Sequence, residues 1–123
     1  MTARALWCVS PGKAEIRDAA MGEGVAVRAL WSGISRGTER LVFGGGVPEA
    51  EWARMRAPYQ EGTFPFPVKY GYSMVGEATE GALAGRVVFA LFPHQTAFRL
   101  PEAALIAVPD GVPAARAVLA ANM

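Results

Sequence analysis

One serine in the chain lies in a pattern typical of nucleophilic catalysis. Residues 33–37 (GISRG) match G-x-S-x-G, which in serine hydrolases places the nucleophile on a sharp turn between a strand and a helix. Such a serine needs a histidine base and an orienting carboxylate, in the chain order serine, acid, histidine. His94 is the only histidine, and Glu77 or Glu80 could be the acid. No long helix is evident after Ser35, so a serine hydrolase using Ser35 is a minor alternative.

His94 could also act without a nucleophile. Imidazole exchanges a proton near neutral pH, so this residue could donate a proton or position a substrate. A hydrogen-bonded loop histidine is the structural alternative, and we weigh the two equally. Glycines 44–46 are expected to form a turn, because the chain contains neither G-x-G-x-x-G nor G-x-x-x-x-G-K-[ST]. Cys8 is the only cysteine, which excludes an intramolecular disulfide and a site built on several thiolates.

Composition indicates one ordinary globular domain. The 123 residues are 52% hydrophobic, enough for a core without disulfide or metal. Twelve basic and eleven acidic residues give a formal net charge of +1, and no basic stripe is present, so we expect no nucleic-acid partner. The apolar run at residues 5–9 is too short for a signal peptide or a membrane span, so we expect no membrane association. The cysteine content fits a cytoplasmic location.

Short elements joined by frequent turns must position Ser35 and His94, because fourteen glycines and nine prolines divide the chain into short segments. Pro48 at a first helical position, followed by two glutamates and two arginines, predicts a short helix over 48–56. A helical turn is expected to begin at Thr38, and an alanine-rich helix over 113–123. Residues 57–66 should form an irregular connection. Strands are expected over residues 3–9, 14–17, 25–32, 68–80, 86–91 and 95–100, the last pairing back. The predicted class is therefore mostly β, a barrel or rolled sheet with short helices.

Four segments together resemble the N-terminal domain of the medium-chain dehydrogenase/reductase superfamily. They are WSGISRGTE at 31–39, FPFPVKYGYSMVG at 64–76, GRVVFAL at 85–91 and VPDGVPAARAVLAANM at 108–123. Their order and spacing match the family, and the resemblance covers nearly the whole chain. It implies a GroES-like, partly open β-barrel whose C-terminal helix leads into a Rossmann domain that is missing here. Residues 1–123 would then be the substrate-side domain alone, without a cofactor-binding domain.

The ligands of the family's catalytic zinc are not present at the similar positions. Ser35 or Arg36 stands where the zinc-binding cysteine falls, Gly-Tyr-Ser at 71–73 replaces the Gly-His-Glu segment, and Ala121 occupies the third position. None of these side chains is a good donor for tetrahedral zinc. The resemblance therefore implies a member of a zinc-less branch, and we expect no metal.

A zinc-less member must polarise its substrate carbonyl with hydrogen bonds, and the similar positions carry hydroxyl groups on Ser35, Thr38, Tyr72 and Ser73. Tyr72 is the preferred donor, with a buried, backbone-satisfied phenol as its equal alternative. Thr38 matches the family's hydroxyl proton relay, although Thr38 and the glutamate after it could equally cap a helix. Arg36 resembles the arginine that some members place near the cofactor pyrophosphate, where a guanidinium suits a bidentate contact.

The function implied is the N-terminal substrate-side part of a zinc-independent NAD(P)-dependent alcohol dehydrogenase or carbonyl reductase acting on a small carbonyl or alcohol. The complete enzyme would bind NAD(P)H through the missing Rossmann domain, so this chain alone should bind no cofactor and be inactive. An incomplete barrel leaves an unpaired edge, which favours self-association and leaves a homodimer open. The competing hypothesis is a stand-alone, non-enzymatic barrel that binds a small molecule or a partner chain.

Overall fold

The fold consists of short strands in two antiparallel sheets with a few short helices. The computed structural model describes residues 2–122. The strands are β1 (Ala3–Ser10), β2 (Lys13–Ala19), β3 (Val25–Ser32), β4 (Glu61–Gly62), β5 (Val68–Lys69), β6 (Met74–Ala78), β7 (Val87–Ala90), β8 (Ala97–Leu100) and β9 (Ile106–Ala107). The α-helices are α1 (Thr38–Phe43), α2 (Trp52–Met55) and α3 (Ala114–Ala117), and 3₁₀ turns cover Glu49–Glu51, Glu102–Ala104 and Val118–Asn122. The expected mostly β architecture with short helices is confirmed.

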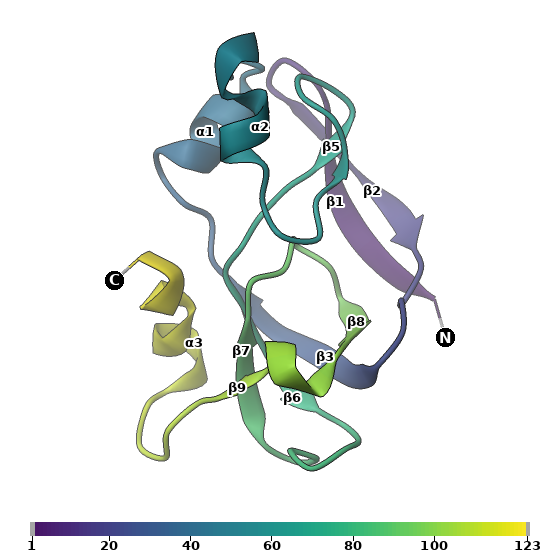
Figure 1. Cartoon of the computed structure of the whole chain (residues 1–123), viewed down its shortest axis with the longest axis vertical. Coiled ribbons are helices and arrows are strands. Elements are labelled where there is room, and N and C mark those ends of the chain that lie inside the picture. Colours follow the sequence, from purple (N-terminus) through teal and green to yellow (C-terminus); the bar gives the residue numbers. More distant parts are fainter. Residues whose placement is uncertain (1, 123) are drawn as a thin grey trace.

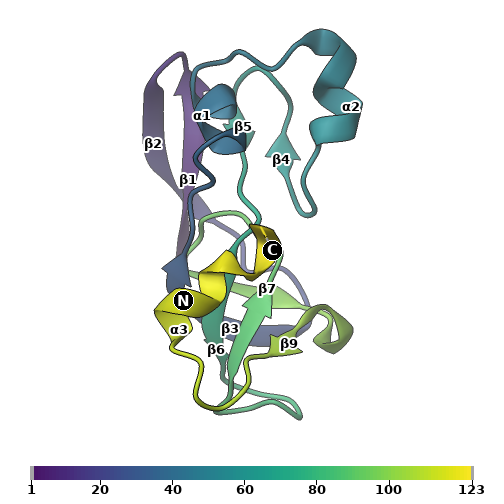
Figure 2. The ribbon, with the colours of Figure 1, turned by 90° about the vertical axis from the view of Figure 1, so that its left-hand side faces the viewer.

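The two sheets lie at opposite ends of the molecule. The first has the strand order β2-β1-β5-β4 and the second β8-β3-β6-β7-β9. Figure 1 shows α1 and α2 beside the first sheet and α3 beside the second. Turned by 90°, Figure 2 shows α3 lying across one face of the second sheet. The sheets do not close into one barrel, since each has its own edge strands.

Residues 94–96, which we call the bridging segment, connect the two sheets. Leu6 of β1 donates its backbone N–H to the carbonyl of His94 at 3.1 Å, and Thr96 donates to the carbonyl of Arg4 at 2.9 Å. Thr96 also accepts a backbone hydrogen bond from Ala29 of β3 at 2.9 Å. The bridging segment is therefore held between one strand of each sheet.

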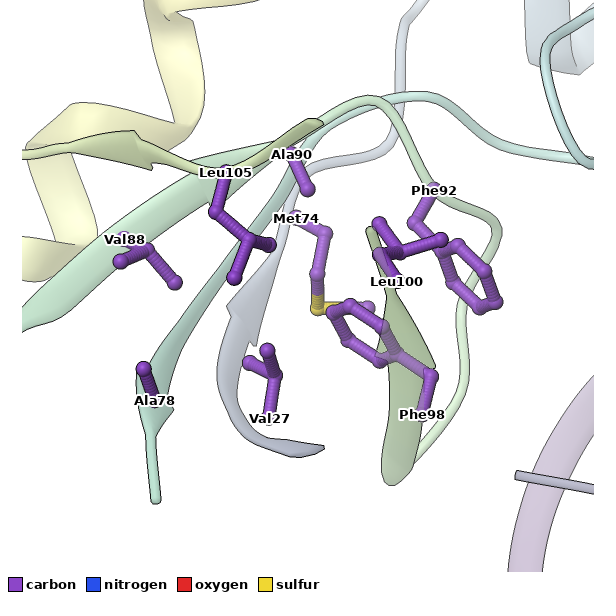
Figure 3. Packing of buried hydrophobic residues seen from close by; sticks show 9 residues of the cluster. All are labelled: Val27, Met74, Ala78, Val88, Ala90, Phe92, Phe98, Leu100 and Leu105. Carbon is purple, nitrogen blue, oxygen red and sulfur yellow. The ribbon is translucent and has the colours of Figure 1, made fainter. Parts of the chain in front are cut away.

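Each sheet has its own buried apolar residues. The cluster of the second sheet, drawn in Figure 3, includes Phe98, which is fully buried and stacks on Phe92 with ring centroids 4.2 Å apart. A second cluster, around Val42 and Val68, lies between α1 and the first sheet. A third cluster contains Val75 and residues of α3, on the other face of the second sheet. Each fully buried side chain of this kind contributes about 1.5–3 kcal/mol relative to exposure.

The prediction of one strand over residues 68–80 is wrong. The sequence there contains two strands of different sheets, since β5 pairs with β1 and β4, whereas β6 pairs with β3 and β7. Residues 70–73 carry the chain from one sheet to the other, and Gly71 adopts φ +150° within them. The alternation of apolar residues continues across this crossing, so the pattern conceals it.

The other predicted elements are present with local differences. The helix expected over 48–56 begins as a 3₁₀ turn and has one α-helical turn. The alanine-rich helix becomes 3₁₀ after α3, and Met123 lies outside the described residues. Strand β8 pairs with β3 rather than with the preceding β7. The irregular stretch 57–66 contains the short strand β4. No helix within residues 2–122 is long and apolar enough to cross a membrane.

Candidate functional site

A histidine and a glutamate form a nearly buried pair between the two sheets. His94 Nε2 lies 2.5 Å from Glu39 Oε1, and the two side chains are only 11% and 9% exposed. The other ring nitrogen, Nδ1, lies 2.7 Å from Ser32 Oγ. The imidazole is thus held by a carboxylate on one side and a hydroxyl on the other. A ring fixed in this way can exchange protons in a defined direction.

Local folding brings these three side chains together. Ser32 is the last residue of β3 and Glu39 lies in the first turn of α1. The intervening turn is closed by two reciprocal bonds, because Ser35 N donates to Glu39 Oε2 at 2.6 Å and Glu39 N donates to Ser35 Oγ at 3.0 Å. This arrangement is similar to a capping box, in which a serine and a glutamate satisfy each other's backbone N–H groups. The bridging segment then places His94 between the strand end and the helix start.

Gly71 leaves the space that the imidazole occupies. A Cβ atom at this position would lie 3.0 Å from both Cδ2 and Nε2 of His94 and 3.2 Å from Pro93 Cα. Its φ of +150° also lies in the region that favours glycine. The residue thus permits both the chain crossing between sheets and the close approach of the ring.

The imidazole forms part of the wall of two cavities. The more enclosed one, which we call the inner cavity, has a volume of about 320 Å³. The larger and more open one, the outer cavity, has a volume of about 510 Å³ and includes Ser32 in its lining. Glu39 lines only the inner cavity. Apolar side chains dominate the inner cavity, namely Leu6, Cys8, Ala14, Ile34, Val42 and Phe43.

Two further titratable groups line the inner cavity, and Glu39 contributes to raising the pKa of each. Burial, with contributions from Tyr72 and Glu39, raises the pKa of Tyr70 to about 12, and its hydroxyl donates to the carbonyl of Met55 at 2.9 Å. Burial raises the pKa of the Cys8 thiol, and Glu39 raises it further. Both groups are therefore neutral at physiological pH, which leaves Glu39 as the acidic side chain of this cavity.

The arginines at the inner cavity are exposed. Arg36 and Arg40 both line it, and neither forms an ion pair within residues 2–122. A guanidinium without a protein partner is free to contact an anionic group of a ligand. Arg36, expected near a cofactor pyrophosphate, thus lies at the cavity, and its role there stays a prediction.

The predicted hydroxyl residues are only partly brought together. Ser35 lines the inner cavity, but its Oγ accepts the N–H of Glu39. Thr38 begins α1 and Tyr72 packs at 6.2 Å, edge to face, on Tyr70; neither is among the residues lining the two cavities in the described chain. Ser73 is 2% exposed, and its Oγ has no hydrogen-bond partner within residues 2–122.

The geometry does not assemble a hydrolase triad on Ser35. No hydrogen bond joins Ser35 to His94 in the part of the chain that the structure describes. Glu77 and Glu80, the acids considered from the sequence, instead form ion pairs with arginines of the second sheet. The acid that meets His94 is Glu39.

Sequence reasoning selects His94 but misses two of its partners. The pattern around Glu39 suggests only a helix cap, and nothing in the sequence singles out Ser32. The order Ser32, Glu39, His94 is visible in the sequence. Their contact depends on the bridging segment, which no local pattern reveals.

The described residues offer few side chains that could bind a metal ion. Among residues 2–122 there is no group of three or more His, Cys, Asp or Glu side chains that could hold a metal ion. Ser35 and the segment 71–73 carry hydroxyls at the positions compared with zinc ligands. A site that works without zinc stays a prediction.

Comparison with known proteins identifies the fold. No protein-family model matches this chain, and no curated protein does so either. Among solved structures, the quinone oxidoreductase of Thermus thermophilus, determined alone and in complex with NADPH, superposes with a TM-score of 0.59 at 21% identity. The alignment covers 94% of this chain and 35% of that enzyme. The chain therefore has the fold of part of an oxidoreductase and spans about a third of its length.

Proposed function

We propose that this chain is the substrate-side part of a zinc-independent NAD(P)-dependent oxidoreductase that acts on a small carbonyl or alcohol. The observation that carries the proposal is the superposition of 94% of the chain on an enzyme that binds NADPH. The resemblance of residues 31–39, 64–76, 85–91 and 108–123 to a GroES-like domain of the medium-chain dehydrogenase/reductase superfamily points the same way.

The inner cavity is the proposed substrate site. Its apolar walls suit the body of a small organic molecule, and its polar wall at Glu39 and His94 suits a carbonyl or hydroxyl group. Hydrogen bonds must polarise the carbonyl when no metal is bound, and Ser35 is the cavity hydroxyl nearest in sequence to Glu39. Tyr72 and Thr38 remain proposed donors that would have to reorient to reach a substrate.

NAD(P)H would supply the hydride when it is bound to the complete enzyme. Arg36 is exposed and has no ion-pair partner within residues 2–122, which suits a contact with the cofactor's phosphate groups. The Rossmann domain that would hold the nucleotide is proposed to follow this chain.

A stand-alone binding module is the second candidate. It is favoured by the inner cavity, whose walls come from β1, β2, α1 and the loops of this chain alone. Such a module would bind a small apolar molecule without cofactor and without turnover.

The test compares two proteins from the same gene. The reading frame is expressed through its next in-frame stop codon, and NADPH and NADH are titrated into it and into the 123-residue chain, with nucleotide fluorescence as the readout. We expect binding by the longer protein alone. Absence of any extension, or absence of binding by both proteins, would refute the oxidoreductase proposal and favour the binding module.

A further inference from the structure

We propose that Ser32, His94 and Glu39 form a proton relay that connects the inner cavity to the outer cavity and thereby to solvent. This inference rests on the proposed function, because it assigns the source of the proton in carbonyl reduction and its acceptor in alcohol oxidation. It makes His94 and Glu39 the acid–base pair of the site, in place of the hydroxyls selected from sequence.

The imidazole of His94 lies between the two cavities. His94 and Leu6 are the two residues that line both cavities. Nε2 of His94 contacts Glu39, which lines the inner cavity, whereas Nδ1 contacts Ser32, which lines the outer cavity. Each nitrogen of the ring therefore contacts a residue that lines a different cavity. A purely structural contact between these side chains has no need of a cavity on each side.

Exposure increases along the proposed path from Glu39 to Ser32. The side chains of His94 and Glu39 are 11% and 9% exposed, whereas Ser32 is exposed. A carboxylate and an imidazole with so little exposed surface interact strongly, and solvent can reach them from the outer cavity, which Ser32 and His94 both line, or from the inner cavity. A ligand in the inner cavity closes the second route and leaves the first.

Few ionisable side chains surround the pair of His94 and Glu39. Glu39 is the one acidic side chain among the described residues lining either cavity. The groups that face it are Cys8 and Tyr70, both neutral because their pKa values are raised, and the exposed Arg36 and Arg40. Arg4 is the other ionisable residue that lines the outer cavity, besides His94.

Those surroundings do not supply a competing proton donor near physiological pH. Guanidinium groups keep their protons throughout this range. The thiol and the phenol have raised pKa values and hold theirs as well. His94 and Glu39 are therefore the remaining side chains of the inner cavity suited to proton transfer.

The proton balance of carbonyl reduction follows from these contacts. A bound nicotinamide would supply hydride to the carbonyl carbon, and the π electron pair would then move to the oxygen. The proton on Nε2 passes through Glu39 Oε1 to that oxygen, while the hydroxyl proton of Ser32 moves to Nδ1 and water reprotonates Ser32. Glu39 ends as a carboxylate and the imidazole as its other tautomer. Exchange with water restores the first tautomer after the product leaves, and alcohol oxidation runs the same steps in reverse.

The first experiment uses the 123-residue chain and needs no activity. His94 is the only histidine, so histidine-selective nitrogen labelling gives one imidazole in the NMR spectrum. We expect the neutral ring to carry its proton on Nε2, with Glu39→Gln shifting mainly the Nε2 resonance and Ser32→Ala mainly the Nδ1 resonance. Nitrogen shifts of a freely averaging imidazole, unchanged in both variants, would overturn the relay whatever the protein's function.

The second experiment uses the protein encoded by the complete reading frame, with benzaldehyde as the carbonyl substrate probe and NADPH or NADH as reductant. We expect His94→Asn and Glu39→Gln to lower kcat about 100-fold or more, the lower range for loss of a general acid. KM should change by about threefold or less, because the interaction is made in the transition state. Glu77→Gln, on the surface of the second sheet, is the matched control and should retain full activity.

Chemical rescue separates proton transfer from structural damage. His94→Ala should lose activity and regain at least part of it when imidazole is added, and Ser32→Ala should be slowed most at low buffer concentration. An active wild-type enzyme whose variants keep their kcat would overturn the relay alone. A wild-type protein that oxidises neither nucleotide would overturn the proposed function and the catalytic relay together, while the NMR result still decides the hydrogen bonds.

Discussion

Gly71 should be the most sensitive glycine at the site. Replacing it by alanine adds a Cβ atom 3.0 Å from Nε2 and Cδ2 of His94 and 3.2 Å from the Cα atom of Pro93. The Pro93 contact is with backbone, so it is not relieved by a side-chain rotation. We therefore expect the imidazole to move away from Gly71 and its hydrogen bond to Glu39 to weaken.

The magnitude of the Gly71→Ala effect has two parts. The backbone conformation at Gly71, with φ +150°, costs a non-glycine residue about 1–3 kcal/mol. Insertion of one carbon into a well-packed region costs a further contribution of about 1–3 kcal/mol. The free energy of unfolding should therefore fall by about 2–6 kcal/mol, a large share of the total for a domain of this size.

Urea unfolding of Gly71→Ala and Gly85→Ala separates the backbone contribution from the packing contribution. Gly85 also has a positive φ, +83°, but a Cβ there meets nothing within 4 Å. Gly85→Ala should therefore lose only the backbone part, about 1–2 kcal/mol. The imidazole resonances of His94 should shift in Gly71→Ala and stay in place in Gly85→Ala. Equal destabilisation of the two variants, or an unshifted imidazole in Gly71→Ala, would refute the close packing described for this ring.

Three further outcomes are expected. Phe98→Ala should lower the free energy of unfolding by about 3–5 kcal/mol in urea titrations, because the removed ring is fully buried. The pKa of Tyr70 is raised from 10 to about 12, so the phenol ionises at lower pH in the unfolded chain than in the folded one. The free energy of unfolding should therefore fall as pH rises from 10 to about 12, and Tyr70→Phe should lessen that fall. Cys8, whose pKa is raised by burial and by Glu39, should be alkylated by iodoacetamide more slowly than a cysteine in a short peptide, as followed by mass spectrometry; an equal rate would contradict its place in the inner cavity.

The strands are largely predictable because their signals are local. Val25–Ser32 combines partial alternation with β-branched and aromatic residues, and the turn at Gly12 follows the end of β1. The division of 68–80 is not predictable from alternation, since both β5 and β6 bury apolar side chains and only their partners differ. Strand partners depend on contacts distant in sequence.

Individual residues of the site can be predicted from the sequence, but the contacts between them cannot. His94 can be selected because imidazole is suited to proton exchange, and Ser35 because of its glycine-flanked pattern. Glu39 cannot be paired with His94 from the sequence, because 55 residues separate them and the bridging segment decides their contact. The position of Lys69 could not be predicted from sequence either, because lysine is ordinarily exposed. In the structure Lys69 is almost fully buried and donates a hydrogen bond to Gln95 at 2.8 Å.

The separate apolar clusters of the two sheets have a consequence for how this protein can evolve. Substitutions in contacting residues are coupled, whereas those in distant, unconnected clusters contribute additively. Val42 belongs to the cluster of the first sheet and lines the inner cavity, while Phe98 belongs to the second sheet and lines neither cavity. Selection can therefore reshape the cavity for a new ligand through mutations in the first cluster, without repacking the cluster that maintains the larger sheet.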